Sequence, residues 1–166
     1  MIILGIDPGI ANTGYGIVQS NAARVQPLHF GNIQTNPKTA SEERLKIIYD
    51  TISELITQFD VESVVLEDIF FTKNVNNAYI VGEVKGIVKL AAANNSAPVT
   101  TYSPTQVKQT VAGYGKATKL QVQRMVQALL KLKELPQPDH AADALSLAIC
   151  HARSHKLIKI REKFKN

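Results

Sequence analysis

The chain has 166 residues, of which 19 are Lys or Arg and 14 are Asp or Glu, so its formal net charge is +5. This length favours one domain. The composition, with 45% hydrophobic and 20% charged residues, argues against disorder outside the ends. No apolar run reaches the ~18 residues of a membrane span, and the single cysteine, Cys150, excludes a disulfide framework or a cysteine-rich zinc site. Because Asp7 interrupts the first apolar run too early for a secretory leader, we expect a cytoplasmic protein.

The charges are segregated along the chain. Residues 84–133 carry eight basic and no acidic side chains, whereas residues 1–83 carry five basic and ten acidic ones. Residues 134–150 hold three acids and no Lys or Arg, and residues 151–166 hold six basic side chains and one acid. The basic block predicts contacts with the phosphates of a nucleic acid. The basic end, 153–166, is either a mobile tail that adds salt-sensitive affinity or a solvated helix end.

Short apolar runs near the start of the chain predict three strands of an antiparallel meander: residues 2–7, 15–18 and 30–34. The first run stops at Asp7-Pro8-Gly9, which predicts a turn. The capping box Thr39-x-x-Glu42 then opens a helix whose apolar residues recur at helical spacing as far as Phe59. A further apolar run at 63–67 predicts a strand, and the helix that precedes it favours parallel pairing with the first strand.

The second half of the chain predicts four helices and one short strand. A helix follows the loop at 70–77 and continues to about Ala93, and residues 99–102 form the strand. Capping boxes at Ser103 and Thr118 predict the starts of the next two helices. Asp139 is expected to cap the last helix.

Acidic side chains end two of the predicted strands, Asp7 and Glu67, and ligands gather at the carboxyl ends of parallel strands in α/β sheets. His140 and Asp143 lie three residues apart at the start of the last predicted helix, so they share one face of it. We therefore expect three carboxylates and one imidazole to converge. Their mutual repulsion favours a divalent cation, and hard oxygen ligands select Mg²⁺ or Mn²⁺.

Each of these residues has a structural alternative. An Asp before Pro-Gly commonly opens a turn, as at Asp7, and Asp143 in a first helical turn complements the helix dipole. His140 by itself is typical of a surface residue at a helix start. Glu67 is harder to explain in this way, because it ends an otherwise apolar strand. We interpret the four residues together as one site.

The sequence resembles the RuvC family of Holliday-junction resolvases at Ile6-Asp7-Pro8-Gly9, continuing through Thr13-Gly14-Tyr15-Gly16. Further matching segments occur in family order: Leu66 to Phe70, Lys73-Asn74, Gln106 to Val111, Lys119-x-Gln121-Val122 and His140 to Leu145. The resemblance implies an RNase H-like α/β fold, a mixed five-stranded sheet with helices on both faces. It implies a nuclease domain over residues 1–152, followed by the basic tail at 153–166.

The resemblance also implies an activity, the resolution of four-way DNA junctions in recombination and repair. A homodimer would make paired, symmetric nicks that leave 5′-phosphate and 3′-hydroxyl ends. A branch-migration helicase complex is the implied partner. Mg²⁺ is the implied cofactor, with two ions per subunit held by Asp7, Glu67, His140 and Asp143. Many members carry Asp where this chain has His140, so we expect Mn²⁺ to substitute well. His140 is alternatively a general base or proton shuttle.

DNA contacts are assigned to four residues. Lys108, Lys116 and Lys119 occur in family-like motifs or in a Gly-containing loop beside a helix start. By family position, Phe70 stacks on an unpaired base near the cut. The other lysines of the basic block are assigned to a solvated face: Lys85, Lys89, Lys131 and Lys133.

The predicted helix before Ala93 carries many small side chains, from Val81 to the Ala91-Ala92-Ala93 run. Such a helix permits close approach of another helix, either within the core or across a dimer interface, and both alternatives stay open. A two-fold dimer with one site per subunit would match the two strands that a junction offers for cleavage.

The sequence argues against two other nucleotide-binding functions. Gly9-x-x-x-x-Gly14 lacks the Lys-Ser/Thr of a phosphate-binding loop, and actin-like ATPases need a second domain that 166 residues do not supply. Two alternatives remain: a non-catalytic junction-binding module of the same fold, and an RNase H-like nuclease acting on another structured nucleic acid. The presence of Asp7, Glu67 and Asp143 argues against a module that has lost its chemistry.

Overall fold

The computed structural model describes residues 1–21, 24–68 and 75–163, without the side chains of 75–77 and 156–163. Its elements in chain order are β1 (Ile2–Asp7), β2 (Asn12–Ser20), β3 (Val25–Gln34), α1 (Ser41–Gln58), β4 (Ser63–Glu67), α2 (Val75–Asn94), β5 (Val99–Tyr102), α3 (Pro104–Ala112), α4 (Lys119–Leu130) and α5 (Asp139–Lys163). The strands form one sheet in the order β3-β2-β1-β4-β5. Pairing is antiparallel from β3 to β1 and parallel from β1 to β5, so the predicted mixed five-stranded sheet is confirmed.

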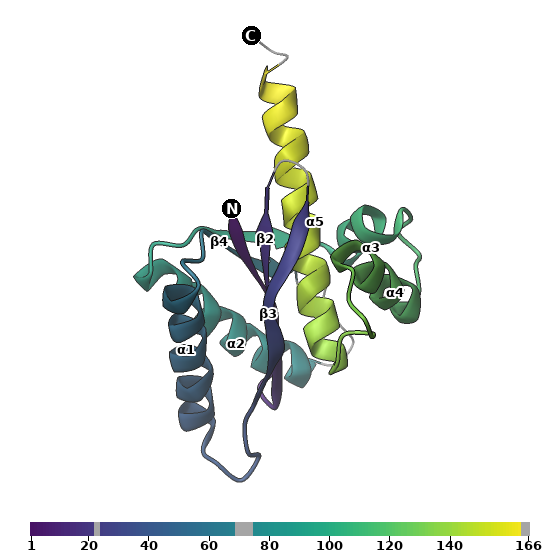
Figure 1. Ribbon diagram of the computed structural model, residues 1–166. Coiled ribbons are helices and arrows are strands. Elements are labelled where there is room, and N and C mark those ends of the chain that lie inside the picture. The colour runs from purple at the N-terminus through teal and green to yellow at the C-terminus, as the bar shows by residue number, and fades with distance from the viewer. Residues whose placement is uncertain (22–23, 69–74, 164–166) are drawn as a thin grey trace.

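Helices cover both faces of the sheet, because side chains alternate along each strand. Leu4 of β1 and Leu66 of β4 belong to a core shared with α1 and α2. Ile3 and Val65, their neighbours in the same strands, belong to a second core shared with α3, α4 and α5. Figure 1 shows α1 and α2 on one side of the sheet and α3, α4 and α5 on the other.

Glycines bring α5 unusually close to the sheet. A Cβ atom on Gly5 of β1 would collide with the main-chain oxygen of Ala144, and one on Gly14 of β2 would collide with that of His140. Only a residue without a side chain allows so close an approach. The first turns of α5 are therefore held directly over the ends of β1 and β2.

Two of the three predicted capping boxes are confirmed, at Ser103 of α3 and Thr118 of α4. The box at Thr39 was wrong: the Thr39 N–H donates to the Asn36 carbonyl in a turn, and α1 begins after Ala40 without a side-chain cap. Asp139 is the first residue of α5 rather than its cap.

α5 continues to Lys163, so residues 153–163 of the expected tail extend this helix. None of the described helices is both long and apolar enough to cross a membrane.

Candidate active site

Asp7 and Glu67 lie side by side at the carboxyl ends of two parallel neighbours. The β1–β4 pairing runs to Ile6–Leu66, so each acid lies one residue past the last pair. Alternation places both acids on the same face as Ile3 and Val65, toward α5. The sheet thus directs the two carboxylates to one side, as predicted from the strand ends.

α5 supplies the other two predicted residues from its first turns. The His140 Nδ1 atom lies 2.7 Å from the Asp7 Oδ2 atom. Asp143, three residues further along α5, lines the same cavity as Asp7 and Glu67. The structure therefore brings the three carboxylates to one cavity and attaches the imidazole to one of them.

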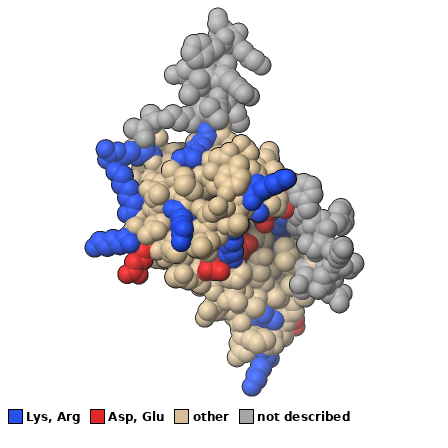
Figure 2. All heavy atoms as spheres, turned by 90° about the vertical axis from the view of Figure 1, so that its right-hand side faces the viewer, with Lys and Arg blue, Asp and Glu red and all other residues tan. Residues whose placement is uncertain are grey.

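The cavity measures about 300 Å³ and lies between the strand ends and helices α3, α4 and α5. The residues that line it are Asp7, Glu67, Pro104, Val107, Lys108, Lys119, Val122, Asp143, Ser146 and Leu147. Two lysines thus border three carboxylates. On the face that carries α3 and α4, basic side chains project at many points, with a few acidic side chains between them (Figure 2).

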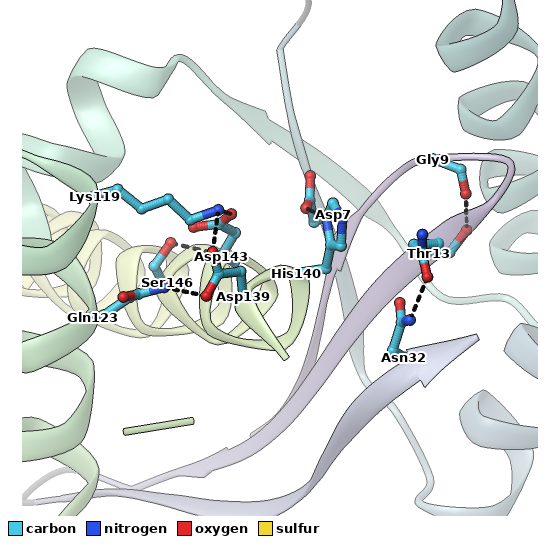
Figure 3. Close-up of polar contacts among 11 residues, drawn as sticks. Asp7, Gly9, Thr13, Asn32, Lys119, Gln123, Asp139, His140, Asp143 and Ser146 are labelled. Atoms are coloured by element: carbon cyan, nitrogen blue, oxygen red, sulfur yellow. Dashed lines mark hydrogen bonds and ion pairs between the residues drawn. The ribbon is translucent and has the colours of Figure 1, made fainter. Parts of the chain in front are cut away.

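Lys119 bridges two acids of α5. Its Nζ atom lies 3.0 Å from the Asp143 Oδ2 atom and 3.3 Å from the Asp139 Oδ2 atom. The other oxygen of Asp139 accepts a hydrogen bond of 3.0 Å from the Gln123 side-chain amide. Figure 3 shows Lys119 reaching Asp139 and Asp143, while His140 lies beside Asp7. This role of Asp139 was not predicted from the sequence, although its spacing of four residues from Asp143 allows one lysine to contact both.

Burial and mutual repulsion perturb the acids of the cavity. Burial raises the pKa of Glu67, and the negative charges of Asp7 and Asp143 raise it further. Burial likewise raises the pKa of Asp143, although the hydrogen bond from Lys119 opposes this. Burial alone would lower the pKa of Lys119, but its bonds to Asp143 and Asp139 outweigh that effect and raise it. The cavity therefore concentrates negative charge that nearby lysines offset only in part.

This donor set fits a hard divalent cation. Three carboxylates supply oxygen ligands, and the repulsion that raises the pKa of Glu67 and Asp143 is relieved when a cation binds between them. Among the described residues, however, no group of three or more His, Cys, Asp or Glu side chains already lies close enough to hold a metal ion. Mg²⁺ commonly takes one or two protein carboxylates and completes its coordination with water, and Lys119 competes with a cation for Asp143.

The predicted DNA contacts have different locations. Lys108 and Lys119 line the cavity. Lys116 is exposed and does not line it. Phe70 lies outside the described residues. The assignment of Lys85 to a solvated face was wrong, because Lys85 is only 8% exposed.

A larger cavity of about 660 Å³ lies at the other end of the sheet, where β2 and β3 meet α4 and α5. Its lining contains Arg24, Lys131 and Arg153 but no acid. Size alone would favour it as the site. We place the chemistry in the smaller cavity, because only that one combines carboxylates with neighbouring cations.

The chain is similar to known proteins over nearly its whole length. The family model described as crossover junction endodeoxyribonuclease RuvC matches residues 3–151. RuvC of Clostridioides difficile (strain 630) is 46% identical over 159 residues, which cover 96% of this chain and 94% of that protein. RuvC of Moorella thermoacetica is 49% identical over 152 residues, covering 92% and 91% of the two chains.

A solved structure of Thermus thermophilus RuvC in complex with Holliday junction substrate matches with a TM-score of 0.90 and 40% identity, covering 95% of this chain and 96% of that one. The predicted RNase H-like arrangement, a mixed sheet with helices on both faces, is thereby confirmed. The chain belongs to the RuvC family of crossover junction endodeoxyribonucleases.

Proposed function

We propose that this protein resolves four-way DNA junctions by paired, symmetric, metal-dependent nicks, and that Asp7, Glu67, His140 and Asp143 form its active site. The observation that carries the proposal is the convergence of Asp7, Glu67 and Asp143 from β1, β4 and α5 on one cavity bordered by Lys108 and Lys119. A four-way junction is the substrate named for the Thermus thermophilus relative. The products are a 5′-phosphate and a 3′-hydroxyl.

Bound Mg²⁺ or Mn²⁺, two ions per subunit, would activate a water for attack on the phosphate and stabilise the departing oxygen. The carboxylates of Asp7, Glu67 and Asp143 would hold these ions, with His140 as a further ligand. In this role His140 would bind the ion through its Nε2 atom. Alternatively, its Nδ1 atom would give up the contact with Asp7 and bind the ion instead. The alternative role of His140 is to move a proton near the attacked phosphate while its Nδ1 atom stays on Asp7.

The lysines around the cavity would hold the DNA. Lys108 and Lys119 border the carboxylates, so they can contact the phosphate that is cut, while Lys116 on the exposed loop before α4 contacts the backbone further away. Phe70 is proposed to stack on an unpaired base. Residues 1–152 would form the nuclease domain, and the basic residues after them would add salt-sensitive affinity.

A homodimer would place one site at each of the two strands to be cut. Its proposed interface is the exposed stripe of α2 formed by Tyr79, Gly82, Gly86 and Leu90, which recur at helical spacing. Tyr79 is 71% exposed and Leu90 is 50% exposed. We also propose a branch-migration helicase as a partner, because the chain belongs to this family.

Replacement of Asp7 by Asn tests the proposal. The variant should bind a four-way junction as the unsubstituted protein does but should not cut it, because it loses a charge that the cation needs. Cleavage is compared on a junction, a linear duplex, a flap and an RNA–DNA hybrid, each with and without Mg²⁺. Retained Mg²⁺-dependent nicking by Asp7→Asn would refute the assigned site. Cutting of the flap or hybrid in preference to the junction would favour a related nuclease, and binding without cutting by the unsubstituted protein would favour a non-catalytic module.

A further inference from the structure

A buried ammonium group lies behind the acidic cavity. Among the described residues, Lys85 is the one Lys, Arg, Asp or Glu side chain that is buried. It belongs to α2, which packs on the face of the sheet opposite α5. Its Nζ atom donates a hydrogen bond to the main-chain carbonyl of Glu67, at the end of β4. Lys85 therefore reaches the strand end from the side away from the cavity, which it does not line.

This contact holds β4 where its pairing with β1 has ended. The last β1–β4 pair is Ile6–Leu66, so the Glu67 peptide lies beyond it. On the other edge, the Asp68 N–H donates a hydrogen bond of 2.7 Å to the Tyr102 carbonyl of β5. Lys85 and β5 together fix the orientation of the peptide from which the Glu67 carboxylate projects.

Stability alone is a weak reason for a lysine at this position. Burial of an ammonium group costs free energy, which nearby acids offset only in part. For Lys85, burial is the largest influence and lowers the pKa, while the charges of Asp68, Glu67 and Asp7 oppose it. Lys89, one turn further along α2, is exposed and avoids this cost.

We propose that Lys85 is a positioning residue, whose bond to the Glu67 carbonyl keeps the Glu67 carboxylate directed into the cavity with Asp7 and Asp143. This inference rests on the proposed function, because it assigns Glu67 to the metal site. It makes α2 part of the support of the active site, although α2 contributes nothing to the cavity lining.

The test compares Lys85→Met with Lys89→Met, which removes the same charge from an exposed position of the same helix. Mn²⁺ binding is measured by electron paramagnetic resonance without DNA, and cleavage is measured in a single turnover on a prebound junction at saturating Mn²⁺. We expect Lys85→Met to bind Mn²⁺ more weakly and to cut between about tenfold and a hundredfold more slowly, because misplacement of a reacting group by about 1 Å has such effects. Its melting temperature is measured alongside, so that a loss of fold is distinguished from a loss of position. Lys85→Arg should restore most of the rate, and Lys89→Met should match the unsubstituted protein.

Charge and position predict opposite changes in metal affinity. Loss of a nearby positive charge alone would strengthen Mn²⁺ binding. Stronger binding with an unchanged saturating rate would therefore overturn the proposal, and so would a lower melting temperature with an unchanged rate. If Lys85→Met does not fold, Lys85→Gln, whose side chain is too short to reach the carbonyl, is judged by the same outcomes. Failure of the unsubstituted protein to cut junctions would refute the proposed function instead, and the Mn²⁺ comparison would still decide the role of Lys85.

Discussion

His140 is the residue at which this site departs from an all-carboxylate set. Its Nδ1 atom lies 2.7 Å from the Asp7 Oδ2 atom, and 44% of its side-chain surface is exposed. An imidazole is a softer and less negative ligand than a carboxylate. The choice of metal should therefore respond to this one position.

The variant His140→Asp tests that dependence. It restores a fourth carboxylate, which makes the site harder and more negative, so the ratio of the cleavage rate in Mn²⁺ to that in Mg²⁺ should fall. Single-turnover cleavage of a junction is measured in each metal at saturating concentration. An unchanged ratio would show that His140 does not contact the metal and would favour the proton-transfer role.

His151 lies deep in the core, and no pattern in the sequence around it indicates a partner or a role. Its Nε2 atom lies 3.2 Å from the Ser63 hydroxyl of β4, and its Nδ1 atom lies 3.0 Å from the Tyr102 hydroxyl of β5. A neutral imidazole satisfies both hydroxyls, because each of them can donate or accept. His151 thus fastens α5 to the two strands beyond β1.

Acid should destabilise the fold through His151. Burial, with a smaller effect of the charge on His155, lowers the pKa of His151 from 6.5 to about 4. In the unfolded chain this group takes up its proton near pH 6.5, so between pH 6.5 and about 4 the unfolded state binds more protons. The free energy of unfolding should therefore fall through this range by on the order of 2 kcal/mol.

Urea unfolding of the unsubstituted protein and of His151→Gln, at pH 6.5 and near pH 4, isolates this contribution. His151→Gln should be less stable at the higher pH but should lose less stability on acidification, since the other titrating groups are common to both. Equal losses would mean that His151 is not the group responsible.

Sequence reasoning succeeded for acids that end apolar strands and failed for polar residues inside helices. Asp7 and Glu67 were located because strand ends are visible as breaks in apolar runs. The burial of Lys85 was not predicted, because α2 carries small or apolar side chains on most sides. Their periodicity therefore does not identify the buried face of the helix. The contacts of His151 could not be predicted either, because its hydrogen bond to Ser63 depends on how α5 crosses the sheet.

At the scale of elements, α5 is the part on which the site depends most, because it crosses β1 and β2 and supplies both His140 and Asp143. Its close approach follows from Gly5 and Gly14 in the strands, of which only Gly14 lies in the family-like motif, and their contacts with α5 are not visible in the sequence. The starts of α3 and α4 could be predicted because their capping boxes are local and complete. The start of α1 could not, because a turn at Asn36 competes for Thr39.

Gly14→Ala should separate α5 from β2. The added Cβ atom would meet the main chain of His140, which cannot move as a flexible side-chain end could. We expect a loss of about 1–3 kcal/mol in the free energy of unfolding, typical of overpacking, together with loss of cleavage. Denaturant unfolding and junction cleavage measure the two effects.

Gly31→Ala of β3 is the matched control within the sheet, because the nearest atoms to its added Cβ atom belong to the outer end of the Tyr15 side chain rather than to a main chain. It should lower the free energy of unfolding less than Gly14→Ala does and should leave cleavage intact, since a side chain can move aside where a main chain cannot. Unaltered stability and cleavage in Gly14→Ala would contradict the close contact between α5 and β2.

At the scale of the whole molecule, acidic and basic side chains lie in different places, which the net charge of +5 does not show. In the proposed function, the acids bind metal ions and the basic groups bind DNA. Carboxylates gather in the cavity, whereas Lys108 of α3 and Lys119 of α4 border it and further basic side chains project from the face around it (Figure 2). DNA bound to this face would leave the exposed stripe of α2 free, because α2 packs on the opposite face of the sheet. The arrangement is compatible with a second subunit on α2.

Leu90→Lys tests the proposed dimer, because it places a charge in the exposed stripe of α2. We expect sedimentation at micromolar concentration to change from dimer to monomer, and paired nicking of a junction to give way to single, uncoordinated nicks. Ile47→Lys is the matched control: Ile47 is 43% exposed on α1, close to the 50% of Leu90, but lies outside the stripe. It should leave the dimer and paired nicking intact. A monomeric unsubstituted protein would exclude the α2 interface at these concentrations, and equal effects of the two substitutions would show that exposed apolar surface in general, rather than this stripe, drives association.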